Sequence, residues 1–121
     1  MEGIVKKREL WSALSELFVD NEINYDAIAK KVQSYSLDTI EYSLFYEVAP
    51  ICSLNFSSVI PAVWSFFEID TIAPLIEQHI SRYNNEKLYK LKADFLVKYY
   101  KFHYKSEWLE LQKEIIFLKN N

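Results

Sequence analysis

Glycine is almost absent from this chain, which limits the folds and the activities that it can support. The 121 residues contain one glycine, Gly3, and no other glycine follows it. Phosphate-binding loops, dinucleotide-binding turns and the strained turn that presents a serine nucleophile all depend on glycine. The sequence therefore excludes the enzyme and nucleotide-binding classes that use these devices.

The length and composition indicate one globular domain over residues 1–121. Half of the residues are hydrophobic, and the aromatic residues comprise 8 Phe, 9 Tyr and 3 Trp. This composition is far from that of a disordered chain, and a chain of this length can bury a hydrophobic core without disulfides or metals.

Apolar periodicity predicts an all-α bundle of five to six helices. The expected helices cover residues 5–18, 25–34, 37–48, 71–83, 86–104 and 107–118. Asn24, Ser36, Asp70 and Ser106 are the expected N-caps. Pro50 is expected to end the third helix, because it restricts the residue before it. Asn84 and Asn85 should end the fourth, and the last two helices are either separate or merged.

Residues 51–67 are the one long stretch without a helical period. The stretch is apolar and holds Pro61, so we expect a structured connection that lies across the helices, with a helical turn near residues 61–64. A pair of strands is the weaker alternative, since no tight hairpin turn is present.

Cysteine usage and the lack of a long apolar segment predict a soluble, cytoplasmic protein. Cys52 is alone, so neither an internal disulfide nor a cysteine-rich zinc site can form. No apolar run follows the basic N-terminal cluster, as a secretory signal would require. The stretch 59–67 is too short to span a bilayer.

The candidate catalytic residues form no recognisable site. His79 and His103 fall on different expected helices, and neither has a metal-ligating residue at i+4 within its own expected helix. Cys52 lies among apolar residues, where a thiol is buried and inert. We therefore expect no catalytic residue, no metal, no cofactor and no enzyme activity. Trp11, Trp64 and Trp108 are expected in the core.

Charge is unevenly distributed along the chain, although the net charge is only −3. Residues 9–77 contain eleven acids against Lys30 and Lys31, whereas residues 82–105 contain seven basic residues against Glu86 and Asp94. A division of this kind can steer partners of opposite charge.

The basic helix over residues 87–105 has two interpretations. In the first, Leu88, Leu91, Phe95 and Phe102 enter the core, and the lysines form the solvated face of the helix or pair with the acidic half of the chain. In the second, the lysines follow phosphates and the interleaved tyrosines stack on bases, as in a small nucleic-acid-binding module. The overall acidity and the lack of arginine in this helix favour the first.

The acidic half contains a candidate protein-binding surface. The predicted contact residues are five acids and two aromatic residues that lie beside them: Asp20, Glu22, Tyr25, Asp26, Phe67, Glu68 and Asp70. Carboxylates would set the encounter rate with a basic protein, while Tyr25 and Phe67 would anchor the contact. The alternative is that these acids only cap and precede helices.

Three segments resemble a family of small, uncharacterised bacterial proteins. They are ELWSALSELFVD at residues 9–20, EVAPIC at 47–52 and PAVWSFF at 61–67. Proteins of this sort are similar to the immunity proteins of contact-dependent growth inhibition toxins. The resemblance implies a cytoplasmic protein that binds a cognate toxin domain, expected to be a basic nuclease, and occludes its active site. It assigns no catalytic residue, and the basic segment after residue 80 departs from the pattern.

Overall fold

The computed structural model describes residues 2–18, 22–53 and 69–120, with the side chains of residues 2–6 left aside. All regular structure in these residues is helical, which confirms the all-α class. The elements are α1 (Glu2–Ser15), a 3₁₀ turn (Glu16–Phe18), α2 (Tyr25–Val32), α3 (Leu37–Tyr42), a π-helical segment (Ser43–Val48), α4 (Ala49–Cys52), α5 (Ile69–Asn85), α6 (Lys87–His103) and α7 (Lys105–Lys119).

Two predicted N-caps are confirmed. The Asn24 side chain accepts a hydrogen bond from the Ala27 backbone N–H at 3.1 Å, and Ser36 Oγ accepts one from Thr39 at 3.1 Å. Each cap satisfies a backbone donor that the first turn of a helix leaves without a partner. These two residues therefore fix the starts of α2 and α3.

Pro50 does not end the third helix, and this prediction is wrong. The chain passes from α3 through the π-helical segment into α4, which contains Pro50 and extends to Cys52. A proline has no N–H to give to the carbonyl four residues earlier, here that of Tyr46. His79 on α5 donates to this carbonyl instead, at 3.1 Å from Nε2. The helix thus continues past Pro50, and a side chain from another element hydrogen-bonds a carbonyl of the preceding turn.

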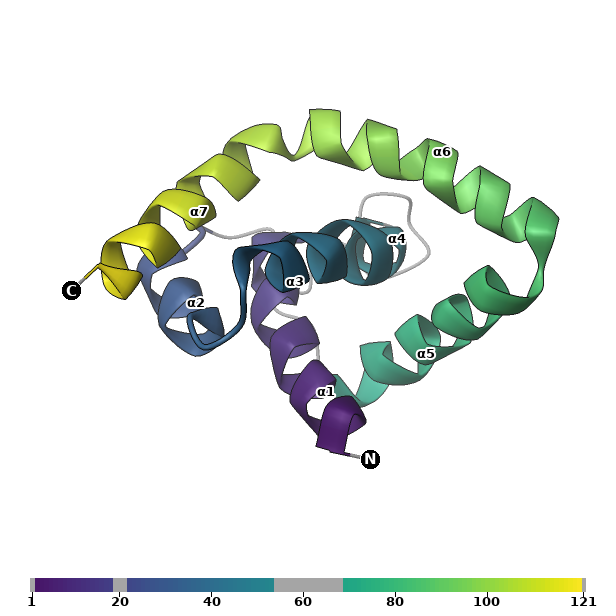
Figure 1. Ribbon diagram of the computed structural model, residues 1–121, viewed down its shortest axis with the longest axis horizontal. Coiled ribbons are helices and arrows are strands. Elements are labelled where there is room, and N and C mark those ends of the chain that lie inside the picture. The colour runs from purple at the N-terminus through teal and green to yellow at the C-terminus, as the bar shows by residue number, and fades with distance from the viewer. Residues whose placement is uncertain (1, 19–21, 54–68, 121) are drawn as a thin grey trace.

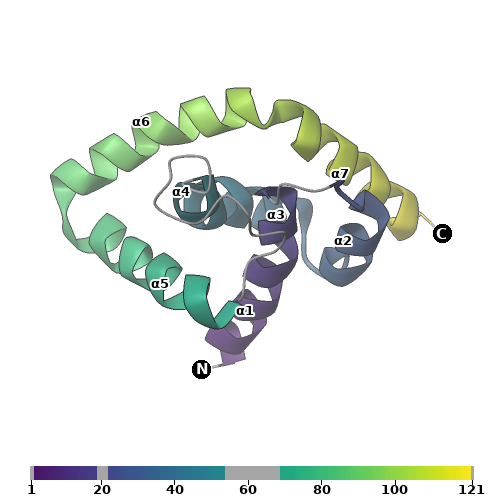
Figure 2. The same cartoon turned by 180° about the vertical axis from the view of Figure 1, so that it is seen from behind.

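The helices α5, α6 and α7 follow one another around the outside of the molecule (Figure 1). Seen from behind, they enclose the central run from α3 to α4 on three sides (Figure 2). A single residue, Tyr104, separates α6 from α7, so the last two helices are distinct. Its backbone, at φ −105° and ψ 22°, produces the bend between them.

Three predicted helix ends on these outer elements need correction. Asp70 lies within the first turn of α5, which begins at Ile69, so it is not the residue before the helix. Ser106 lies inside α7, where its hydroxyl contacts Glu107 at 3.1 Å and caps nothing. Asn84 and Asn85 belong to α5, and the extended residue Glu86 follows them.

One hydrophobic core connects all the helices. Trp11 and Trp108 are buried in it, as predicted, and so is Cys52. The expected inner face of the first helix is also confirmed, with Leu10, Leu14, Leu17 and Phe18 buried. Residues 51–53 are helical, contrary to the expected irregular connection, while the rest of that stretch and Trp64 lie outside the described residues.

The described helices include none that is long and apolar enough to cross a membrane. The longest, α5 and α6, have 17 residues each, and charged residues interrupt both.

Candidate protein-interaction surface

The helix α6 packs against the rest of the molecule through a face that is rich in tyrosine. Ala93, Val97 and Tyr100 are buried on this inner face, next to the π-helical segment and α5. The small side chain of Ala93 lets the backbone of α6 come close to its neighbours. The core therefore holds α6 by a face of mixed polarity.

The inner face also carries a specific polar contact. Tyr89 Oη lies 2.6 Å from His79 Nδ1, and His79 Nε2 lies 3.1 Å from the Tyr46 carbonyl oxygen. A carbonyl only accepts, so Nε2 carries the proton and the Tyr89 hydroxyl donates to Nδ1. Burial lowers the pKa of His79 below its ordinary 6.5, although the hydrogen bond to Tyr46 opposes this. The neutral ring thus links α5, α6 and the π-helical segment.

The outer face of α6 carries four large apolar side chains that the described residues leave uncovered. Their exposed fractions are 82% for Leu88, 66% for Leu91, 73% for Phe95 and 74% for Phe102. We call these four residues the outer apolar stripe. At 3.6 residues per turn, they lie within ~60° of one another around the helix axis. The expectation that they enter the core is wrong, because the tyrosine-rich face takes that place.

The lysines of α6 do not pair with the acidic half of the chain in the described residues. The five of them are exposed: Lys87, Lys90, Lys92, Lys98 and Lys101. None forms an ion pair with a described carboxylate. Lys90 and Lys101 lie over the rings of Tyr83 and Tyr46, at 5.6 and 5.9 Å. Asp94, the acid of α6, accepts the Tyr83 hydroxyl instead. The predicted internal pairing is therefore wrong for this part of the chain.

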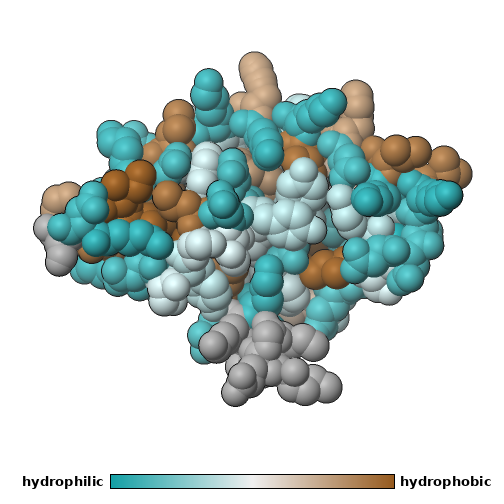
Figure 3. Space-filling view, viewed as in Figure 1, coloured by the Kyte–Doolittle hydropathy of each residue, from teal (hydrophilic) through white to brown (hydrophobic). Residues whose placement is uncertain are grey.

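The apolar surface continues beyond α6. Phe102 and Leu109 line one shallow hollow at the bend into α7, and Ile116 lies one heptad further along. Leu109 and Ile116 are exposed to 45% and 41%. Figure 3 shows hydrophobic side chains along the rim of the molecule over α6 and α7, with hydrophilic ones between them. Monomeric domains rarely expose a long apolar row of this kind unless it binds something.

The structure describes four of the seven predicted contact residues and does not gather them into one site. Tyr25 and Asp26 begin α2, where burial and the nearby Glu107 and Glu110 of α7 raise the pKa of Tyr25. Asp70 lies at the start of α5, beside the N-terminal half of α1 (Figure 1). Glu22 is exposed. Asp20, Phe67 and Glu68 lie outside the described residues.

Two of these acids have basic partners within the molecule. Asp26 pairs with Lys30 at 3.2 Å, and Asp70 pairs with Arg8 at 2.7 Å. Both acids are exposed, so the pairs weaken only slightly the attraction of each carboxylate for an outside cation. Two acids of this set thus have a described basic partner, whereas the α6 lysines have no described carboxylate partner.

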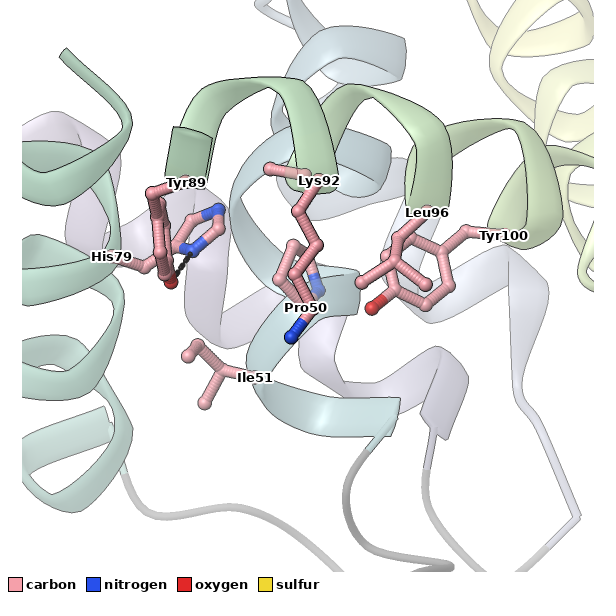
Figure 4. A pocket seen from close by; sticks show the side chains of 8 residues that line it. Pro50, Ile51, His79, Tyr89, Lys92, Leu96 and Tyr100 are labelled. Atoms are coloured by element: carbon pink, nitrogen blue, oxygen red, sulfur yellow. Dashed lines mark hydrogen bonds between the residues drawn. The ribbon is translucent and has the colours of Figure 1, made fainter. Parts of the chain in front are cut away.

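A small cavity lies between α4, α5 and α6 (Figure 4). Its volume is about 270 Å³, and Lys92 lines it together with the His79–Tyr89 pair and apolar residues. Both nitrogens of His79 are already hydrogen-bonded. The described lining residues include no carboxylate or thiol.

Glu47 is a buried carboxylate in the π-helical segment. Its Oε1 accepts hydrogen bonds from Lys7 Nζ at 3.0 Å, Trp11 Nε1 at 3.0 Å and Ser43 Oγ at 2.8 Å. These donors join α1 to the centre of the fold and match the charge of Glu47. Among the described residues, no group of three or more His, Cys, Asp or Glu side chains could hold a metal ion.

The fold and the surface together define a small all-α domain with one uncovered apolar helix face. The chain belongs to the family described as a domain of unknown function (DUF7079), whose model matches residues 5–114. This range includes the whole of α6 and therefore both of its faces. No curated protein and no solved structure matches the chain.

Proposed function

We propose that this domain acts by stoichiometric binding of a partner protein. The observation that carries the proposal is the outer apolar stripe on α6, which the described fold leaves exposed to water. A face of this size and order has a cost in solubility, and burial against a partner removes that cost. The adjacent lysines, which have no carboxylate partner among the described residues, add charge that would orient the partner.

The specific role that we propose is that of an immunity protein, in the bacterial cytoplasm, which neutralises a cognate toxin domain. The resemblance of residues 9–20, 47–52 and 61–67 to small bacterial proteins of this kind supports the role. An inhibitor needs no catalytic group, and a binding surface is enough. Occlusion of the toxin's active site is the proposed mode of action.

The proposal has two candidate contact surfaces. The acidic set would face a basic nuclease, and the α6 face would bind an acidic region of the toxin. We favour the α6 face because its apolar side chains are exposed and its lysines have no described carboxylate partner.

The test is co-expression with the product of the gene immediately upstream, followed by size-exclusion chromatography. We expect a one-to-one complex and survival of the host that makes both proteins. Elution of the two products separately, or host death despite a full supply of this domain, would contradict the proposal.

Variants then decide between the surfaces. Replacement of Asp20, Glu22, Asp26, Glu68 and Asp70 by Lys tests the acidic set, and Leu88→Ser with Phe95→Ser tests α6. We expect the complex to survive the first change and to be lost in the second, at unchanged melting temperatures. The reverse pattern would assign the contact to the acidic set.

Nucleic-acid binding is the second candidate function, and exposed lysines on α6 favour it. His103 also stacks on the exposed Tyr99, with ring centroids 5.3 Å apart. A mobility-shift assay with RNA and DNA at low and physiological salt tests this function. Binding that falls steeply with salt would support it, whereas an absence of any shift at low salt would exclude it.

A further inference from the structure

The outer apolar stripe has the spacing of a helix–helix contact. Leu88, Phe95 and Phe102 recur every seventh residue, and Leu91 lies between the first two at the i+3 position. This is the a/d pattern of residues that pack against a second helix. The stripe runs along α6, whose 17 residues extend over about 25 Å.

The width of the stripe distinguishes a helix from a lipid surface. An arc of ~60° fits a narrow contact with one helix, whereas an amphipathic helix that lies in a membrane uses a broader apolar face. Lys98 interrupts the stripe at the d position that follows Leu91. A polar residue at such a position fixes the register of a helix pair.

The residues beside the stripe determine the charge of the partner. The flanking g positions hold Lys87, Asp94 and Lys101, while Lys92 at an e position lines the inner cavity. Asp94 accepts the Tyr83 hydroxyl, and Lys87 and Lys101 have no described carboxylate partner. A second copy of α6 would place lysines against lysines, which disfavours a symmetric pair.

We infer that α6 binds an acidic amphipathic helix of the partner, which lies along the outer apolar stripe. Its apolar side chains, at positions three and four residues apart, cover Leu88, Leu91, Phe95 and Phe102. Glu or Asp residues on its flanks pair with Lys87 and Lys101. The inference rests on the proposed function in one respect, namely that this face binds a protein.

Three synthetic helices provide the probe, measured by fluorescence anisotropy against the full-length protein. Each has 21 residues with Leu at a and d, and the flanking e and g positions are Glu in the first, Lys in the second and Gln in the third. We expect the Glu peptide to bind at least ten times more tightly than the Lys peptide, with the Gln peptide between them. Equal affinities for the three peptides would overturn the inference.

Variants of the protein locate the contact. Phe95→Ser with Phe102→Ser should weaken the Glu peptide at least tenfold, while Leu75→Ser, which changes an apolar residue that is 41% exposed on α5, should not. Replacement of Lys87 and Lys101 by Gln should abolish the preference for Glu over Lys. A preference that survives this replacement would contradict the assigned flanks.

The same protein tests three other possible occupants of the outer apolar stripe. Sedimentation equilibrium reports on a second copy, vesicles of phosphatidylserine and phosphatidylcholine on a membrane, and single-stranded RNA on nucleic acid. A dimer, or tighter binding to vesicles or RNA than to the Glu peptide, would overturn the inference. If the native complex forms while the peptides do not differ, the inference alone fails. If the Glu peptide binds but no native complex forms, the proposed function alone fails.

Discussion

The two faces of α6 differ from what hydrophobicity alone predicts. Tyrosine side chains lie on the inner face, and the more hydrophobic Leu and Phe side chains lie on the exposed outer face. The inner face buries Tyr100 and half-buries Tyr89, whose hydroxyl is hydrogen-bonded, whereas the outer face exposes Leu88, Phe95 and Phe102. The fold therefore uses aromatic rings with polar tips for its own packing. The pure hydrocarbon side chains remain available for a partner.

This difference allows the stability of the fold and the proposed binding to be tested separately on α6. A change on the inner face removes contacts that the folded chain already makes, whereas a change on the outer face removes contacts only in a complex. Four pairs of matched substitutions test this separation, and each pair compares an inner residue with an outer one.

The largest expected effect is the loss of a buried ring. Tyr100→Ala should lower the free energy of unfolding by about 3–5 kcal/mol, since it leaves a cavity in the core. Phe95→Ala, on the exposed face, should change it by less than about 0.5 kcal/mol. Urea unfolding followed by circular dichroism measures both. Similar losses in the two variants would show that the outer face contributes to folding.

The second pair compares the buried charge of Glu47, which has hydrogen-bond donors around it, with the exposed charge of Lys98. Glu47→Gln should cost about 2 kcal/mol, because Trp11, Ser43 and Lys7 lose a charged acceptor. Lys98→Gln should leave stability within about 0.5 kcal/mol of the original value. Thermal and urea unfolding of the two variants would give equal shifts if the charge of Glu47 did not stabilise the fold.

The third pair removes one hydroxyl from each face. Tyr89→Phe should cost about 1–2 kcal/mol, since the buried Nδ1 of His79 loses its donor. Tyr99→Phe, at an exposed position, should be nearly neutral. The same unfolding assay applies, and a neutral Tyr89→Phe variant would contradict a stabilising role for this hydrogen bond.

The smallest expected effect is the pH dependence due to His79. Its folded-state pKa lies below the unfolded value near 6.5, so the unfolded chain takes up the proton first. Stability from this group is complete above pH 6.5 and declines as the pH falls below that value. Unfolding at pH 7.5 and 5.5 should show the decline in the original protein and less of it in His79→Gln. The exposed His103→Gln variant should retain it in full.

Much of the fold could be predicted from local signals in the sequence. Asn24 and Ser36 cap helices because their short polar side chains satisfy the first free backbone donors, and this chemistry is local. The effect of Pro50 could not be predicted in the same way. The donor that replaces its missing N–H comes from His79, which is 29 positions further along the chain.

The candidate surface shows the other limit of sequence patterns. The spacing of Leu88, Leu91, Phe95 and Phe102 indicates an apolar face, yet periodicity does not tell which of two apolar faces meets the core. Tyr89, Ala93, Val97 and Tyr100 form the competing face, and packing against α5 and the π-helical segment decides between them. The sequence contains the heptad spacing of the outer apolar stripe, but a heptad is equally compatible with a buried helix.

The most direct test of the account is lysine acetylation of the one-to-one complex, read by mass spectrometry against the free protein. The account predicts that Lys87 and Lys98 on α6 become protected in the complex, while Lys30 and Lys113 on α2 and α7 react as in the free protein. Protection confined to Lys30 and its neighbours, with the α6 lysines fully reactive, would contradict the claim that the outer face of α6 binds the partner.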